Sequence, residues 1–302
     1  MTCPERPVEE ALTHRVTRDG VGYYYRAGVG TTAVVLIHGM GGSSCNWGLV
    51  TPLLPADTPL VLVDLPWCAT SKGYHGRSEP DGLVDAIREC VSDVWNGPVV
   101  IAAHSIGGFF AWRFMDQDEI LVAGLVLVSA HLFAVGDILS RPFSLDKLPL
   151  RLALADAIIR SFLKPARFLR SAVNCSAAAR RLLMWPIINP VLADGQARVG
   201  DCFRGNGGLG SLRMIREARK IDLYGVAQSS DRPTSIVIGA DDPLLTGQDN
   251  ARIGELANVT AIWQVNGARH FPIIETPGVV ASAIIEQLGR IRDAEGARQG
   301  AR

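Results

Sequence analysis

Short apolar runs that alternate with helix-like stretches constrain the fold of this chain more than any other feature. Three of these runs, at residues 33–37, 60–63 and 99–103, are rich in Val, Ile or Leu, and each ends at a turn. A fourth run, residues 121–128, follows a helix expected at residues 106–115. Buried strands that alternate with helices are typical of a parallel sheet covered on both faces. The sequence therefore predicts the α/β class, with a mostly parallel central sheet and helices on both faces.

The first and last parts of the chain extend this pattern. Residues 23–26 are followed closely by glycines and indicate an antiparallel hairpin at the sheet edge, before the first parallel strand. Two further strands are expected at residues 234–238 and 259–265, and a closing helix at residues 277–292. Residues 295–302 are polar, so we expect the tail to fray.

The middle of the chain has a different character. Helical spacing replaces the strand pattern, most clearly at residues 150–163 and 177–183, and prolines divide the rest into short pieces. We therefore expect an α/β core made of residues 1–130 and 233–302. Residues 131–232 would form a helical cap or lid, inserted before the last two strands.

Composition and charge exclude several classes of protein. The chain has 302 residues, 48% of them hydrophobic and 20% charged, which supports a full core and excludes a disordered chain. The formal net charge is zero, whereas nucleic-acid binding needs a basic surplus. The expected cap nevertheless holds 16 Lys or Arg and 8 Asp or Glu, a local charge of +8. This surplus indicates either a solvated basic face or a docking surface for an acidic partner, such as an acyl carrier protein or a coenzyme A thioester.

Other patterns bear on location and cofactors. Residues 1–10 lack the apolar core of a signal peptide, and the longest apolar stretch, residues 121–135, is shorter than a membrane span. The six cysteines are scattered without a CxxC pair, so we expect a cytoplasmic protein with reduced thiols. No metal-ligand spacing, phosphate-binding loop or dinucleotide fingerprint is present, and we expect no metal and no cofactor.

Ser105 is the strongest chemical signal in the sequence. It lies between a buried strand and a helix, with His104 before it and Ile106, Gly107 and Gly108 after it. A sharp strand-to-helix turn strains the serine backbone and leaves room only for small neighbours. The same turn places the hydroxyl at a helix N-terminus, where backbone N–H groups face developing negative charge.

Two later segments supply partners of the right chemistry. His270 follows one expected strand, and Asp242 follows another. Imidazole titrates near neutrality and can act as base and acid, while a carboxylate can orient it. Asp241 is the rival for the acid, and a resemblance to a known family, described below, favours Asp242, which lies three residues after Gly239. The order Ser105, Asp242, His270 along the chain is the nucleophile–acid–base order of one particular fold.

Together these segments resemble the α/β-hydrolase superfamily, in its capped, lipase- and esterase-like branch, over roughly residues 22–288. Residues 38–43 (HGMGGS) look like the oxyanion loop of the family, residues 64–66 begin its next loop, and residues 103–108 resemble its nucleophile elbow with Ala103 in place of the first glycine. The resemblance implies a Ser105–His270–Asp242 catalytic triad without a cofactor. It also implies an oxyanion hole formed by the backbone amides of Met40 and Ile106.

The implied activity is hydrolysis of an ester, thioester or lactone of a hydrophobic substrate through an acyl-enzyme. An acyltransferase or cyclase with the same triad, a C–C hydrolase or lyase, and a ligand-binding protein without catalysis remain alternatives. The loop after Asp64 departs from the family, because Trp67 and Ala69 stand where glycines are usual. Trp67 could reach the substrate or pack under the cap. His131, at the end of a core strand, is a second weak candidate for substrate contact.

Overall fold

The computed structural model describes residues 12–115, 120–140, 152, 155, 187–189, 191–192 and 208–300. Eight strands form one sheet in the order β1-β2-β4-β3-β5-β6-β7-β8. The strands are β1 (Thr13–Val16), β2 (Gly22–Arg26), β3 (Ala33–Ile37), β4 (Leu60–Val63), β5 (Val99–His104), β6 (Val122–Val128), β7 (Thr234–Gly239) and β8 (Val259–Val265). The pairs β1/β2 and β2/β4 are antiparallel, and every other neighbouring pair is parallel. The predicted α/β class and mostly parallel sheet are confirmed.

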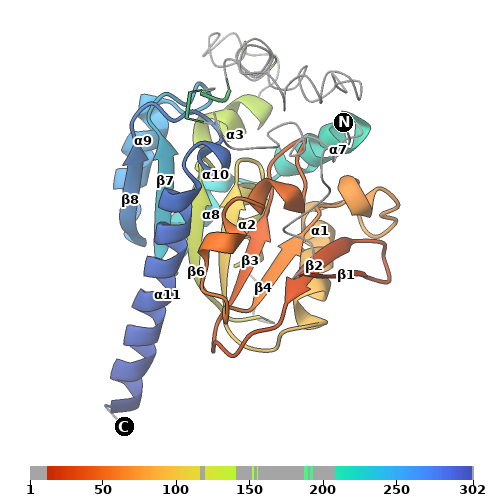
Figure 1. Ribbon diagram of the computed structural model, residues 1–302. Coiled ribbons are helices and arrows are strands. Elements are labelled where there is room, and N and C mark those ends of the chain that lie inside the picture. The colour runs from red at the N-terminus through yellow and green to blue at the C-terminus, as the bar shows by residue number, and fades with distance from the viewer. Residues whose placement is uncertain are drawn as a thin grey trace.

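The helical elements alternate with the strands, as the sequence predicted. The α-helices are α1 (Pro80–Ser92), α2 (Gly107–Phe114), α3 (Phe133–Ser140), α7 (Gly208–Ala218), α8 (Leu223–Ser229), α9 (Gly247–Gly254), α10 (Pro272–Glu275) and α11 (Pro277–Gly300). Short 3₁₀ turns are η2 (Ser44–Trp47), η3 (Thr51–Leu53) and η4 (Ala69–Ser71). Figure 1 shows the helices arranged around the twisted sheet.

Helices cover both faces of the sheet because its central strands are apolar at every position. In β3, Val35 and Ile37 pack on the side of α1, α2 and α8. The alternate residues Val34 and Leu36 pack on the side of α11 and η2. Successive side chains of a strand point to opposite faces, so a run that is apolar throughout can be buried only between two layers. Each fully buried Val, Leu or Ile contributes about 1.5–3 kcal/mol to this core.

The strand ends agree closely with the sequence pattern. Strands β3, β4 and β8 have the predicted bounds, while β5 and β7 each extend one residue further, to His104 and Gly239. The closing helix is longer than predicted: α11 continues to Gly300, past the expected end at Arg292, and runs beyond the strands (Figure 1). The expectation of a frayed tail from Glu295 was therefore wrong as far as Gly300, because Ala, Glu, Arg and Gln in this stretch favour a helix.

The expected cap lies largely outside the described residues, and its bounds of 131–232 stay a prediction. This holds for most of the two helices expected at residues 150–163 and 177–183. Between β6 and β7 the described helices are α3, α7 and α8, so helices do occupy parts of this stretch. Two short described pieces, residues 187–189 and 191–192, also come from it.

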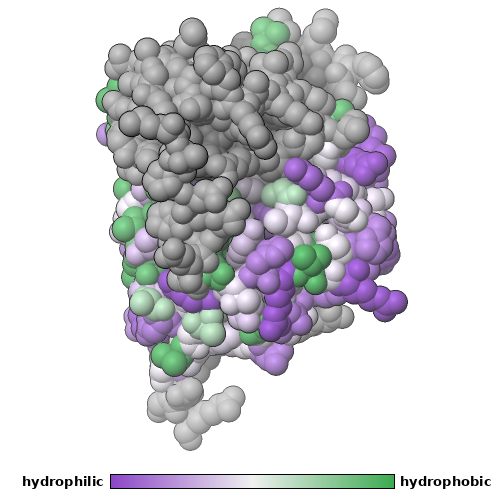
Figure 2. All heavy atoms as spheres, turned by 45° about the vertical axis from the view of Figure 1, so that its right-hand side comes forward, coloured by the Kyte–Doolittle hydropathy of each residue, from purple (hydrophilic) through white to green (hydrophobic). Residues whose placement is uncertain are grey.

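Among the described residues on the face shown in Figure 2, hydrophobic residues are interspersed among hydrophilic ones. Two of the exposed large hydrophobic residues in the described part are Val29 and Leu53. Within the same residues, no helix is both long enough and apolar enough to cross a membrane.

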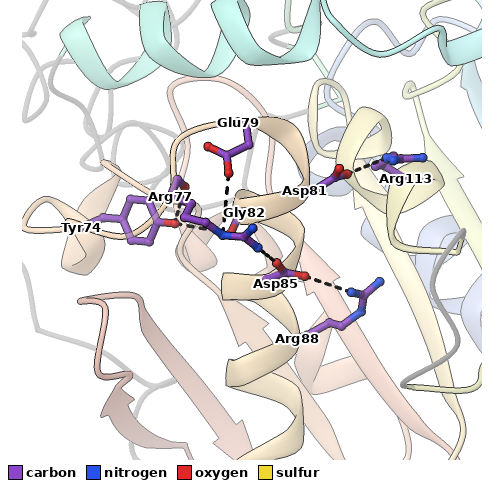
Figure 3. A network of polar contacts seen from close by, with 8 residues as sticks. All are labelled: Tyr74, Arg77, Glu79, Asp81, Gly82, Asp85, Arg88 and Arg113. Atoms are coloured by element: carbon purple, nitrogen blue, oxygen red, sulfur yellow. Dashed lines mark hydrogen bonds and ion pairs between the residues drawn. The ribbon is translucent and has the colours of Figure 1, made fainter.

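A polar network ties α1 to the loop before it and to α2 (Figure 3). Arg77 pairs with Asp85 on α1, and the Tyr74 hydroxyl donates to the carbonyl of Arg77 at 2.6 Å. Arg113 on α2 pairs with Asp81 at 2.8 Å. Exposed ion pairs are individually weak, but this set joins one loop to two helices. It fixes the loop whose other end carries Trp67.

Candidate active site

Ser105 lies in a strained turn between β5 and α2. Its φ is +54°, in the left-handed region that non-glycine residues rarely adopt. The two glycines after it leave no room for a side chain. A Cβ at Gly107 would lie 2.7 Å from the carbonyl oxygen of His38, and one at Gly108 would lie 2.7 Å from that of Ala130. The small residues that pointed to a tight turn are therefore required by the close approach of two neighbouring backbones.

The ring of His270 lies between Ser105 and Asp242. Its Nε2 is 2.8 Å from Ser105 Oγ, and its Nδ1 is 2.8 Å from Asp242 Oδ2. An ionised carboxylate only accepts hydrogen bonds, so Nδ1–H donates to Asp242 and Nε2 accepts the Ser105 hydroxyl proton. Ser105 follows β5, Asp242 follows β7 and His270 follows β8. All three side chains thus come from the carboxyl ends of parallel strands, which is where ligands bind in open α/β sheets.

The carboxylate that faces His270 is that of Asp242, whereas Asp241 is exposed. The Asp242 carboxylate is fully buried, and its second oxygen accepts the N–H of Leu244 at 2.9 Å. Burial alone would raise the pKa of Asp242, but the charge and hydrogen bond of His270 and the N–H of Leu244 outweigh it and lower the pKa. The acid is therefore ionised near neutral pH.

Met40 and Ile106 are the two expected oxyanion donors. Ile106 follows Ser105 directly, and Gly39, the neighbour of Met40, lies so close that a Cβ on it would be 2.8 Å from Ser105 Cβ. Within the described residues, the backbone N–H of neither residue takes part in a hydrogen bond. The loop that carries Met40 is held by His38, whose Nε2 accepts the N–H of Leu65 at 2.9 Å and whose Nδ1–H donates to the carbonyl of Gly39 at 2.7 Å. Both amides are available for a ligand oxygen, and their role stays a prediction.

His104 makes a contact that the sequence analysis did not foresee. Its Nε2–H donates to the carbonyl oxygen of His270 at 2.7 Å, and the two rings lie 5.2 Å apart. Burial, reinforced by the charge of His270, lowers the pKa of His104 to about 3, so the ring is neutral in the physiological range. The residue before Ser105 therefore holds the backbone of His270. Its position beside the serine was the only signal available in the sequence.

Glu275, on α10, is a second residue that sequence reasoning missed. Its carboxyl is buried and accepts the N–H of Arg269 at 2.8 Å, directly before His270, and the N–H of Asn189. Burial raises the pKa of Glu275 to about 7, although both N–H groups work against this shift. A buried carboxyl with its pKa near neutrality, next to a candidate site, is the kind of group that functional sites contain.

Trp67 and Ala69 are the two residues that depart from the family pattern. Both have a positive φ, +65° and +39°, so the usual glycines are replaced while the left-handed backbone is kept. The Trp67 ring lies edge-on to Tyr74 at 5.5 Å, and the guanidinium of Arg213 on α7 lies over it at 5.5 Å. Trp67 thus packs against α7, in the stretch expected to be the cap, and contact with a substrate stays a prediction.

His131, the other weak candidate for substrate contact, is fully buried after the end of β6. Burial lowers the pKa of His131 to about 4, with the charge of Asp242 opposing the shift. The ring is therefore neutral at pH 7 and lies near the acid. Its contact with a substrate also stays a prediction.

The described residues hold no group of three or more His, Cys, Asp or Glu placed to bind a metal ion. Cys68 is buried, which raises the pKa of its thiol to about 12 and keeps it protonated. The chemistry that this arrangement supports is nucleophilic attack by Ser105, with His270 as base.

Comparison with known proteins agrees with the fold. The chain is similar to pimeloyl-[acyl-carrier protein] methyl ester esterase of Sodalis glossinidius (strain morsitans), at 27% identity over 268 residues, which cover 87% of this chain and 96% of the esterase. A carboxylesterase structure from Nitrososphaera gargenis has a TM-score of 0.65 at 18% identity, covering 93% of this chain and all of the other (100%). A loop variant of a haloalkane dehalogenase from Bradyrhizobium elkanii also has a TM-score of 0.65, at 14% identity, with 95% and 99% covered.

The two structural likenesses show the fold alone, because one fold hosts many reactions. A model of the Alpha/beta hydrolase family matches residues 34–283, from β3 into α11, and so covers the strands from β3 to β8 and all three candidate triad residues. The chain therefore belongs to the α/β-hydrolase family.

Proposed function

We propose that this protein is a serine hydrolase that cleaves an ester, thioester or lactone of a hydrophobic substrate through an acyl-enzyme. The observation that carries the proposal is the pair of 2.8 Å hydrogen bonds by which His270 joins Ser105 to Asp242. An activated serine requires a base within hydrogen-bond reach, and that base must be oriented by a third group. The esterase-type relative of the chain supports an ester or related acyl substrate.

In the proposed mechanism, Ser105 Oγ attacks the substrate carbonyl carbon while His270 Nε2 takes the hydroxyl proton. The carbonyl oxygen becomes an oxyanion that accepts the N–H groups of Met40 and Ile106, each such donor being worth about 3 kcal/mol. The C–O or C–S bond then breaks, and the leaving group takes the proton from His270. Water repeats the sequence on the acyl-enzyme, which releases the acid and restores Ser105.

Asp242 keeps His270 ready for both proton transfers. Its buried carboxylate fixes the tautomer with the proton on Nδ1, so Nε2 is free to accept. It also stabilises the imidazolium that forms in each transition state. Because the pKa of Asp242 is lowered, this stabilising charge is present throughout the neutral range.

The expected docking of an acyl carrier protein or coenzyme A thioester is a further part of the proposal. Helix α7 and the turn that follows it expose Arg213, Arg216, Arg219 and Lys220, while the acidic residue of α7, Glu217, is buried against two of them. The relative from Sodalis glossinidius is named for an acyl-carrier-protein ester. Docking through this charge predicts that KM for a carrier-bound ester rises steeply with salt, whereas KM for a small neutral ester does not. Equal salt dependence for both substrates would argue against docking.

Labelling with a fluorophosphonate tests the reaction class. Intact-protein mass should show one adduct on the wild type and none on Ser105→Ala, with Ser92→Ala, an exposed serine, as a labelled control. The unlabelled wild type would then be assayed on esters, thioesters and lactones, with and without alcohol or amine acceptors. Product partition toward the acceptor would favour the acyltransferase or cyclase alternative. A folded wild type that stays unlabelled would refute the activated serine.

A further inference from the structure

A short piece of the expected cap lies directly against the loop that carries His270. Residues 187–189 belong to the stretch between β6 and β7, whereas His270 lies between β8 and α10. Ile187 accepts the backbone N–H of His270 through its carbonyl oxygen, at 3.1 Å. The side chains of Ile187 and Ile188 are buried in the same cluster as Phe271 and Ile273. The cap stretch therefore contacts the histidine backbone itself.

Asn189 makes the other contacts between these two segments. Its side-chain Nδ2 donates to the carbonyl of Gly267 at 2.7 Å, and its backbone N–H donates to Glu275. Gly267 has a φ of +76°, a left-handed turn that glycine adopts without strain. Asn189 thus contacts the loop at both of its ends, before and after His270.

Glu275, which is buried, joins the two segments through its side chain. Its two carboxyl oxygens accept one N–H each, from Asn189 and from Arg269. The backbone N–H of His270 donates to the carbonyl of Ile187, and the backbone carbonyl of His270 accepts Nε2–H of His104. Three of these contacts come from residues 187–189 and would be lost if that segment moved away.

We propose that Asn189 is a positioning residue for His270, so that the stretch between β6 and β7 takes part in assembling the catalytic triad as well as in covering it. The proposal rests on His270 acting as the base of the proposed serine hydrolase. Its consequence is that a ligand or partner that displaces residues 187–189 also changes the reach of His270 toward Ser105. Catalytic groups lose one to two powers of ten in rate when they are displaced by about 1 Å.

Two variants of Asn189 and one matched control test this inference. Asn189→Ala removes the bond to Gly267 and keeps the backbone N–H. Asn189→Asp keeps the size of the side chain but places a carboxylate oxygen against the carbonyl oxygen of Gly267. It therefore separates loss of the hydrogen bond to Gly267 from loss of side-chain packing. Val191→Ala is the control, because the Val191 side chain lies nearby and is 61% exposed. All four proteins are compared by circular dichroism and thermal unfolding before the measurement.

The first readout is the rate of fluorophosphonate labelling at saturating and limiting probe. We expect the maximal labelling rate of both Asn189 variants to fall about tenfold or more, with the probe concentration for half-maximal rate changed less than about twofold. A residue that only stabilises the fold would leave the maximal rate of the folded fraction unchanged. Val191→Ala should label like the wild type.

The second readout is hydrogen exchange of the amides in residues 267–275, followed by mass spectrometry. Faster exchange in this loop in Asn189→Ala, with unchanged exchange in β5 and β7, is the expected result. Wild-type labelling rates and exchange in both folded Asn189 variants would overturn the inference. An unlabelled wild type would refute the proposed hydrolase, and exchange would then decide alone whether Asn189 orders the loop.

Discussion

Asp242→Asn is the substitution whose effect follows most directly from the geometry. In the wild type one carboxylate oxygen accepts the Leu244 N–H at 2.9 Å, and the other accepts Nδ1–H of His270 at 2.8 Å. An asparagine has one acceptor oxygen and an NH₂ group. The Leu244 N–H is fixed in the backbone and keeps the oxygen, so the NH₂ faces His270. The imidazole must then move its proton to Nε2, where it can no longer accept the proton of Ser105.

The magnitude follows from this inverted tautomer. The carboxylate is fully buried, so water cannot restore the lost arrangement. Loss of the correct tautomer in a serine triad lowers kcat by about 10⁴, which corresponds to about 5 kcal/mol of transition-state stabilisation. The unfolding free energy should change far less, by about 1–3 kcal/mol, because one hydrogen bond at a buried site is altered.

The assay is the rate of nucleophilic attack by Ser105, measured as phosphonylation by a fluorophosphonate or as ester turnover at pH 7–8. Asp241→Asn is the matched control, because it replaces a carboxylate by an amide in the same way, but at a neighbouring residue that is exposed. We expect Asp241→Asn to retain wild-type activity. If Asp241→Asn lost activity while Asp242→Asn kept it, the assignment of the acid would be wrong. If neither lost activity, the proton transfer through His270 would be refuted.

Three further predictions concern stability. Ser105→Gly should unfold with a free energy about 1 kcal/mol higher than that of Ser105→Ala in urea titration, because alanine keeps the left-handed φ of +54° and glycine relieves it; equal values would mean that the turn is not strained. Ala69→Gly should likewise stabilise the wild type by up to about 1 kcal/mol, given its φ of +39°, and a lower urea midpoint would contradict this. Burial raises the pKa of Glu275 from 4.5 to about 7, so the folded state holds a proton that the unfolded state releases. This contribution lowers the unfolding free energy by about 3 kcal/mol as the pH rises from 4.5 to about 7. Glu275→Gln should therefore flatten the dependence of the unfolding free energy on pH between pH 5 and pH 7.5. An unchanged dependence on pH would refute the shifted pKa.

The parts of the fold that the sequence predicted are those in which local pattern and tertiary burial agree. The apolar runs that became β3, β4 and β8 are bounded by turn residues, so their ends could be placed without knowing their neighbours. The start of α11 at Pro277 was predicted, but its end was missed because the polar stretch to Gly300 has no apolar stripe, and only the helix propensity of its residues signals the structure.

The candidate site was predictable to the extent that it depends on residues at strand ends. Ser105, Asp242 and His270 each follow a strand, and parallel strands bring their carboxyl ends to one edge. The contacts that hold His270 were not predictable, because they join side chains to backbone groups far away in the chain. His104 contacts a carbonyl 166 residues later, and Asn189 contacts one 78 residues later. No periodicity or motif reports such pairs.

Trp67 shows how a departure from a family pattern can be interpreted physically. Glycine, which is usual at its position, adopts a left-handed backbone without strain, and the structure keeps that backbone with a tryptophan in place. The sequence analysis did not predict this conformation. It also did not predict the partner of Trp67, because Arg213 lies on α7, far away in the chain.

The hydrogen bond from the His270 amide to Ile187 also limits how this protein can be redesigned. Exchange of lids between relatives is an obvious way to change substrate range. Such an exchange assumes that the lid depends on the core only at its two chain ends. In this protein residues 187–189, inside the expected cap, make a further contact with the core, besides that of Arg213 with Trp67. A chimaera that keeps the two outer boundaries but replaces this segment should still fold and yet lose turnover. Turnover should be kept only if the donor segment places a backbone carbonyl and an asparagine side chain where Ile187 and Asn189 lie.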